Sequence, residues 1–353
     1  MRGAAFLMVM VFTAGCGKPF FLVTQSRVAL DTPIVMNGRF VQETPPVSEG
    51  GPVVAMPVGG VCLEAGGPRI ALVDVDGLLL NADLTGPFSL GENPVALFRE
   101  KLDAIAADPD VAAVVVRINT PGGGVTATDI MWHDLQAFRC RTGRPVVACL
   151  LDLGTGGGYY LATASDLIIA HPTTITGGIG VVLNLYNLQD TMAYFNVISQ
   201  IIKAGPLIDM GTVTAALSDE TRRLLQEMAN EFQARFRRVV EQARPGVDPR
   251  EGTTFDGRVF TAGQALERRL IDRIGYLDDA LDAARQLAGT PGAPAVLFHR
   301  RNDPGRSVYA VTPNVPLQST FLPVSVPGLE RSRLPTFLYL WQPDPTLERF
   351  GGK

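Results

Sequence analysis

The ten residues 151–160, Leu-Asp-Leu-Gly-Thr-Gly-Gly-Gly-Tyr-Tyr, constrain the fold of this chain more than any other stretch. The apolar run 145–151 predicts a buried strand, and a helical pattern resumes over 159–165. The glycines between them permit a tight turn and the close approach of another backbone. A strand-to-helix elbow of this kind presents a nucleophile in covalent catalysis, but glycine occupies its centre here.

Short apolar runs alternate with helical patterns along the body of the chain. Strands are predicted at 70–75, 111–118, 146–151, 167–170 and 197–202, and helices at 94–107, 126–138, 218–239, from 261 and at 277–287. Thr126 with Asp129, and Thr261 with Gln264, each predict a capping box. This alternation predicts an α/β fold with a parallel sheet flanked by helices on both faces.

Residues 1–16 have the features of an export signal. One cation, Arg2, precedes a short apolar run over 4–12, and small residues stand directly before Cys16. The apolar run is too short to span a bilayer. The pattern resembles a bacterial lipoprotein cleavage site, after which Cys16 would carry lipid. The alternative is an ordinary secretory signal with an incidental cysteine.

Composition excludes some functions. The chain has 46% hydrophobic residues and a net charge of -4, so it can bury a large core but offers no basic field for nucleic acid. Beyond residue 16, no apolar segment is long enough to cross a membrane. If Cys16 carries lipid, three cysteines are left. Cys149 is expected to be buried, whereas pairing of Cys62 with Cys140 stays open.

Glycine and proline density divides the chain into four parts. We expect a signal peptide over 1–16, a tether or arm over 17–68, an α/β domain over 69–288 and a Pro-rich tail over 289–353. No internal repeat is present. Whether residues 301–353 pack on a neighbour or stay mobile is open at this point.

A second glycine turn follows the strand predicted at 111–118. Its sequence, Asn-Thr-Pro-Gly-Gly-Gly over 119–124, lets backbone N–H groups converge on a developing negative charge. Gly122 and Gly123, with Gly157 of the elbow, are therefore the candidates for an oxyanion hole. The alternative is a plain glycine turn before a helix.

Five motifs together resemble one known family. The segments 118–124, 151–160, 174–180, 202–205 and 256–260 are similar, in the same order, to motifs of the signal peptide peptidase A (protease IV) family of Ser/Lys proteases, short single-unit type. The resemblance covers about residues 69–287. It implies a crotonase/Clp-protease-like core, assembly into a ring or dome of subunits and no cofactor. It places the general base at Lys203, which would have to be kept neutral by desolvation.

Three positions depart from the family pattern. The nucleophilic serine falls on Gly156, a second serine falls on Gly178, and a third is replaced by Thr120. Without the attacking hydroxyl, no acyl-enzyme is expected at Gly156. Thr155 is a substitute nucleophile, although adjacent residues of an extended turn point to different sides and a misplacement of about 1 Å can cost ~100-fold in rate.

These observations favour a lipid-anchored protein of the bacterial envelope with defective proteolysis. We expect it to bind an extended apolar or signal-peptide-like ligand or to act as a scaffold, as a homo-oligomer without metal or nucleic acid. Gly17 after Cys16 favours the periplasmic side of the outer membrane over the inner membrane. The alternatives are an active serine-type or threonine-type endopeptidase that degrades signal peptides or envelope proteins, and an assembly partner for an active paralogue.

Overall fold

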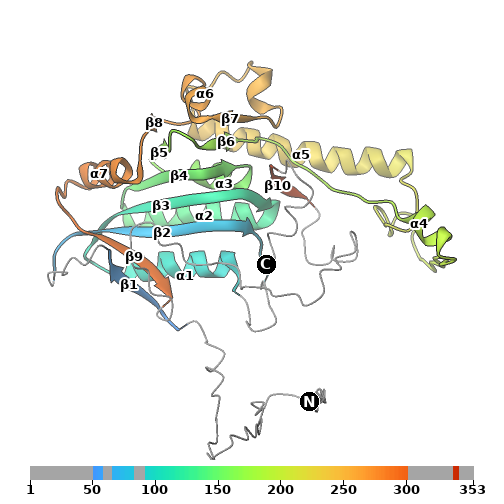
Figure 1. Ribbon diagram of the computed structural model, residues 1–353, viewed down its shortest axis with the longest axis horizontal. Helices are drawn as coiled ribbons and strands as arrows, with labels where there is room; N and C mark the ends of the chain where they lie inside the picture. The colour runs from blue at the N-terminus through green and yellow to red at the C-terminus, as the bar shows by residue number, and fades with distance from the viewer. Residues whose placement is uncertain (1–50, 59–65, 83–91, 301–336, 342–353) are drawn as a thin grey trace, which may run out of the picture. The chain divides into compact units, whose positions relative to one another are not determined.

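A parallel sheet forms the centre of the molecule (Figure 1). The structure, a computed structural model, describes residues 51–58, 66–82, 92–300 and 337–341. The neighbouring strands β2 (Arg69–Leu79), β3 (Val111–Gly124), β4 (Val146–Thr155) and β5 (Leu167–Ala170) are parallel. The predictions for Cys16 and Cys62 lie outside the described residues.

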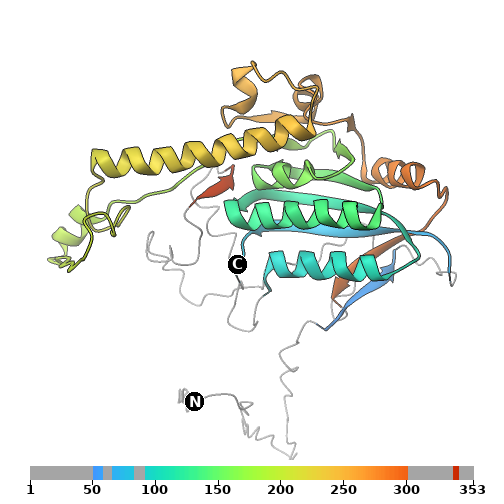
Figure 2. The same cartoon turned by 180° about the vertical axis from the view of Figure 1, so that it is seen from behind.

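Helices cover both faces of this sheet. On one face lie α1 (Pro94–Ala107), α2 (Val125–Thr142) and α3 (Gly157–Ala162), as Figure 2 shows from behind. On the other lies α7 (Leu277–Ala288). Alternate β2 residues face the two layers, with Val73 in the cluster that contains Met131 of α2 and Leu72 in the cluster that contains Leu281 of α7. The predicted α/β fold with a helix-flanked parallel sheet is confirmed.

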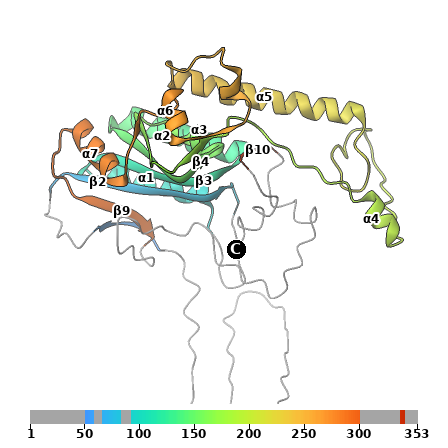
Figure 3. The ribbon, with the colours of Figure 1, turned by 45° about the horizontal axis from the view of Figure 1, so that its top comes forward.

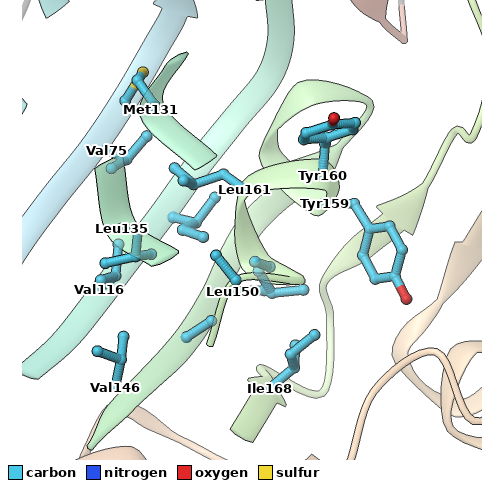
Figure 4. Packing of buried hydrophobic residues seen from close by; sticks show 14 of the residues in the cluster. Val75, Val116, Met131, Leu135, Val146, Leu150, Tyr159, Tyr160, Leu161 and Ile168 are labelled. Carbon is cyan, nitrogen blue, oxygen red and sulfur yellow. The ribbon is translucent and has the colours of Figure 1, made fainter. Parts of the chain in front are cut away.

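Buried side chains of the first layer pack beneath the elbow (Figure 4). Val116 of β3 and Leu150 of β4 lie in one cluster with Leu135 of α2 and Leu161 of α3. All four side chains are fully buried. Burying a side chain of this size is worth roughly 1.5–3 kcal/mol, so this layer fixes α3 firmly on the sheet.

The start of α2 differs from the prediction. The helix begins after Gly124, and no side chain caps it, so the capping box predicted for Thr126 and Asp129 is wrong. Asp129 instead accepts a hydrogen bond from the Tyr160 hydroxyl and pairs with Arg235. The Asp129 carboxylate is therefore engaged in tertiary contacts and does not cap the start of α2.

A smaller layer follows the elbow. It contains β6 (Ile175–Gly177), η1 (Gly252–Phe255), β7 (Val259–Thr261), α6 (Ala262–Glu267) and β8 (Arg273–Ile274). β6 pairs with β4 and β7, and β8 pairs with β5. The capping box predicted for Thr261 and Gln264 is confirmed at the start of α6.

A long helix and its preceding segment extend beyond the edge of the sheet (Figures 1 and 3). They comprise α4 (Gln189–Tyr194) and α5 (Asp219–Ala243), the latter capped by Ser218 as predicted. The strand predicted at 197–202 is wrong, because this stretch has no regular structure. Its apolar side chains meet no sheet; Ile202 is fully exposed and Ile198 is 75% exposed.

Three further strands come from segments expected to form the arm and the tail. β1 (Val53–Pro57) pairs antiparallel with β9 (Ala295–Arg300), and β9 pairs with β2. β10 (Leu338–Leu340) pairs antiparallel with the end of β3. Part of the Pro-rich tail therefore packs on the domain, at the glycine turn of the candidate site.

Candidate active site

The predicted elbow is present between β4 and α3. Gly156 adopts φ 52° and ψ -118°, a combination that L-residues rarely adopt. Its N–H donates to the carbonyl of Gly177 at 2.9 Å, and its own carbonyl accepts from the N–H of Tyr160 at 2.9 Å. Strand, sharp turn and helix thus follow one another as in a nucleophile elbow, with no side chain at the centre.

The next two glycines let α3 lie directly against α2 and the end of β3. A Cβ on Gly157 would lie 2.5 Å from the hydroxyl oxygen of Thr128, and one on Gly158 would lie 2.6 Å from the methyl carbon of Thr120. Neither approach leaves room for a side chain. The glycine run therefore serves close packing as well as the turn.

The structure brings the candidate oxyanion-hole glycines together. Gly122 has φ 111°, and a Cβ on it would lie 2.7 Å from the backbone nitrogen of Gly157. The Gly122 N–H donates to the Thr120 hydroxyl at 3.0 Å, and that hydroxyl donates to the carbonyl of Gly77. Gly122 and Gly157 thus lie side by side, whereas a Cβ on Gly123 would meet the backbone of Leu79 on β2. The Gly122 N–H is already donated to Thr120, and the oxyanion hole at these glycines stays a prediction.

The chain's own residues 337–341 lie across this turn. In β10, Tyr339 stands opposite Gly123 and Leu338 opposite Gly124. The outer edge of the segment pairs with Val182, which exchanges two hydrogen bonds of 3.0 Å with Leu338. The Trp341 N–H donates to the carbonyl of Pro121 at 3.1 Å. The 337–341 segment therefore lies as an extended strand between two backbone edges.

The carbonyl of Tyr339 occupies the place that a side chain at the elbow would need. A Cβ on Gly156 would overlap the carbonyl oxygen of Tyr339 and lie 2.7 Å from its carbonyl carbon. A Cβ on Gly178 would lie 3.5 Å from the Cβ of Trp341. Gly156 and Gly178, the two positions where the resemblance predicts serine, therefore both lie beside the 337–341 segment.

An aromatic pocket holds the side chain of Tyr339. The ring stacks on Tyr160 with centroids 5.3 Å apart and contacts Phe236 of α5 at 4.7 Å. The Tyr339 hydroxyl donates to the carbonyl of Phe232 at 2.8 Å, and burial raises its pKa. Phe337 contacts the ring of Phe232 at 5.0 Å. Sequence analysis missed these residues; the signal was the apolar run Phe-Leu-Tyr-Leu-Trp within the Pro-rich tail.

Thr155, the substitute nucleophile, lies next to Gly156 and is fully buried. Within the described residues, its hydroxyl oxygen has no hydrogen-bond partner, and neither has that of Thr128. Nucleophilic attack by a hydroxyl requires a base within hydrogen-bond reach. The described part of a single chain supplies no such base at Thr155.

Lys203, the predicted general base, lies in the segment that joins α4 to α5. Its amine donates to the carbonyl of Pro206 at 2.9 Å and to the carboxylate of Asp209 at 2.7 Å. The hydrogen bond from Lys203 lowers the pKa of the Asp209 carboxyl. The lysine is exposed in a single chain, whereas a lysine that acts as a base must be desolvated. Its hydrogen bonds are to its own segment and not to the elbow.

The described residues contain neither a candidate metal site nor a candidate membrane-spanning helix. No three histidine, cysteine or acidic side chains in this part of the chain are grouped to hold a metal ion. Among its helices, none combines the length and apolar character that a membrane crossing requires.

Comparison with known proteins identifies the family. Residues 139–290 match the model of peptidase family S49. The chain is 31% identical to a putative protease of Synechocystis over 59% of its own length and 73% of that protein. The chain therefore belongs to peptidase family S49.

Two further relatives carry more specific names. The chain is 31% identical to protease 4 of Salmonella typhi over 63% of its own length and 35% of that protein. It is 28% identical to a putative signal peptide peptidase SppA of Enterococcus faecium over 63% of its own length and 64% of that protein. The chain thus spans less than two thirds of either relative. Among solved structures, a membrane-bound stomatin-specific protease gives a TM-score of 0.37 at 15% identity, too low to support an argument.

Proposed function

We propose that this protein is a peptide-binding member of family S49 with defective proteolysis. The observation that carries the proposal is the elbow itself. Gly156 has no side chain, and the carbonyl of an extended strand lies against it. The site keeps the features that bind a peptide backbone and lacks the group that would form a bond to it.

Covalent catalysis needs three parts, and one is missing. Gly122 and Gly157 lie side by side at the turn, and Lys203 matches the family base, but position 156 carries no hydroxyl. Loss of the nucleophile in a serine peptidase leaves only binding and electrostatic contributions, which amount to ~10³–10⁴-fold over water. We therefore expect the full chain to bind extended apolar peptides and to cleave them little.

The competing function is an active endopeptidase with Thr155 as nucleophile. The buried hydroxyl of Thr155, which has no hydrogen-bond partner in the described residues, supports this alternative. Lys203 from a second copy would then supply the base.

Hydrolysis of casein and of a signal-peptide substrate by the full chain decides between the two functions. We expect no turnover above that of a Lys203→Ala control. Robust cleavage that disappears in both Thr155→Ala and Lys203→Ala would establish the endopeptidase and overturn our proposal.

For location, we propose a lipid anchor at Cys16 and residence on the periplasmic side of the outer membrane. Small residues before Cys16 and Gly17 after it support this assignment. Two or more acyl chains anchor a protein stably. Mass spectrometry of the mature N-terminus tests it: a lipidated Cys16 is expected, and an unmodified terminus elsewhere contradicts it.

A further inference from the structure

We propose that residues 337–341 are the resident ligand of the peptide groove, and that the groove selects its occupant by one buried aromatic side chain, that of Tyr339. The inference rests on the proposed function, since it names the ligand of the same site. The groove is bounded by the end of β3 on one side and Val182 on the other. Figures 1 and 2 show β10 beside β3 and beneath α5.

Backbone pairing on both edges holds the segment without regard to sequence. The N–H of Val125 donates to the carbonyl of Phe337 at 3.2 Å, at the opposite end of the segment from the bond between Trp341 and Pro121. Leu338 exchanges two bonds with Val182. Addition of a strand to exposed edges is a common mode of peptide recognition, in which the main chain supplies affinity and side-chain pockets supply specificity.

The pocket for Tyr339 supplies that specificity. The side chain is fully buried, and its ring is enclosed by Tyr160 and Phe236. The carbonyl of Phe232 accepts the tyrosine hydroxyl, so a ring with a para hydroxyl satisfies every polar group there. An aliphatic side chain would leave the aromatic contacts unfilled, and a charged one would lose its hydration between two aromatic rings.

The other side chains of the segment have less demanding neighbours. Leu340 packs against Leu78 and Leu80, and Phe337 lies on Phe232. Pockets of this kind accept other apolar residues of similar size. The groove therefore fits an extended apolar segment with tyrosine at the position whose carbonyl meets Gly156.

Glycine at position 156 is a condition for this occupancy, and Gly178 lies beside the same segment. A Cβ at Gly156 would collide with the backbone of Tyr339, and one at Gly178 would lie close to Trp341. The two hydroxyl losses thus occur where the resident strand passes closest to the elbow. Any other peptide must displace the 337–341 segment, which lowers its apparent affinity by the fraction of time that the groove is open.

The test measures binding of a labelled peptide with the sequence of residues 336–342, preceded by two lysines for solubility, to the full chain. Wild type is compared with Tyr339→Asp, which expels the resident side chain, and with Tyr276→Asp, a matched change at a 55% exposed tyrosine that lies outside the groove. We expect Tyr339→Asp to bind the peptide at least about tenfold more tightly than wild type. We also expect Tyr276→Asp to match wild type, and a peptide with alanine for the tyrosine to lose binding. Equal affinity of wild type and Tyr339→Asp, or of the two peptides, would overturn the proposal.

Hydrogen exchange of the wild-type chain keeps the test decisive if Tyr339→Asp fails to fold. The amides of Leu338 and Val182 should exchange slowly, and excess unlabelled peptide should accelerate exchange at Leu338. Fast exchange at Leu338 without peptide contradicts residence in the groove. Protection that is lost on dilution assigns the strand to a second copy and contradicts residence in its own groove. Peptide binding and hydrogen exchange do not depend on proteolysis, whereas the proposed function is tested by substrate hydrolysis. A failure of one proposal can therefore be distinguished from a failure of the other.

Discussion

At the scale of single residues, Gly156 decides what the site can do. The backbone there adopts φ 52° and ψ -118°, which costs an L-residue about 1–3 kcal/mol. In enzymes with a nucleophile elbow, the nucleophilic residue adopts a strained backbone conformation that exposes its hydroxyl. Glycine removes the strain and the hydroxyl together, and it opens the space into which the carbonyl of Tyr339 fits.

Replacement of Gly156 by serine should therefore destabilise the chain before it restores any chemistry. We expect Gly156→Ser to lower the free energy of unfolding by about 1–3 kcal/mol, from backbone strain and collision with Tyr339. Urea denaturation measures it, with Gly263→Ser as control because no atom lies within 4 Å of a Cβ there. Unfolding midpoints of Gly156→Ser and wild type that coincide would argue against a strand packed on the elbow.

The hydroxyl of Thr155 should be dispensable. It is buried without a hydrogen-bond partner in the described residues, so Thr155→Val should leave stability unchanged or raise it slightly. The matched change Thr176→Val removes a hydroxyl that donates to Gly154 at 2.7 Å and should cost about 1 kcal/mol. Thermal denaturation compares the two. A larger loss at Thr155 than at Thr176 would show that the hydroxyl makes an essential contact.

At the scale of elements, α1 is joined to the sheet by a buried amine. Lys101 of α1 is fully buried, and its Nζ lies 3.5 Å from the carbonyl of Asp74 on β2. Burial lowers the pKa of Lys101 to about 8, against the opposing effect of the Asp74 and Glu92 charges. Arg117 and Arg300 lower it further.

This shift predicts how stability changes with pH. In the unfolded chain the lysine keeps its proton to about pH 10.5, whereas the folded chain loses it above about pH 8. The unfolded state therefore binds more protons between these values, and stability rises with pH. Relative to Lys101→Met, wild type should gain about 1–3 kcal/mol of unfolding free energy from pH 8 to pH 10. Urea titrations at each pH check the difference; a difference that stays constant or falls contradicts it.

The elements that sequence predicted are those with strong local signals. The Val-rich run of β3, the elbow of β4 and α3, and the Ser218 cap of α5 all appear where the pattern places them. β10 was not predictable, because its partners, Gly122–Gly124 and Val182, lie more than 150 residues earlier in the sequence. The strand predicted at 197–202 was wrong because an apolar run can also form an exposed surface that serves association.

The glycines of the site were also predictable from a local sequence signal. Their turns require glycine locally, so Gly122, Gly156 and Gly157 stand out in the sequence and lie together in the structure. The contacts of Lys203 are with its own α4–α5 segment, and no local sequence pattern encodes where that segment lies relative to the elbow. The aromatic pocket joins α3, α5 and β10, and only tertiary packing brings those elements together.

At the scale of the whole molecule, exposed apolar side chains gather in the segment around Lys203. Seven of them are at least 47% exposed: Tyr194, Phe195, Val197, Ile198, Ile201, Ile202 and Ile208. Patches of this kind on soluble domains mark interaction surfaces. We propose that copies of this chain associate through this segment, which would also remove Lys203 from solvent as the family base requires.

The proposed association predicts a change of mass with a single substitution. Ile202→Glu should shift the full chain towards monomer, since a carboxylate in an apolar interface is buried without a partner. The control is Leu266→Glu on α6, at a 39% exposed leucine outside the segment. Light scattering after size exclusion measures both, and the far-UV circular dichroism spectrum should be unchanged in each. A wild-type chain that is already monomeric would contradict association through this surface.

Reaction of the full-length protein with a fluorophosphonate, followed by intact-mass measurement, tests the central claim most directly. The reagent captures activated hydroxyls, and Gly156 offers none. A known serine hydrolase under the same conditions shows that the reagent is active. The account predicts an unmodified mass for the wild-type chain after full labelling of the control. One adduct per chain that maps to residues 150–160 would show a working nucleophile at the elbow and contradict it.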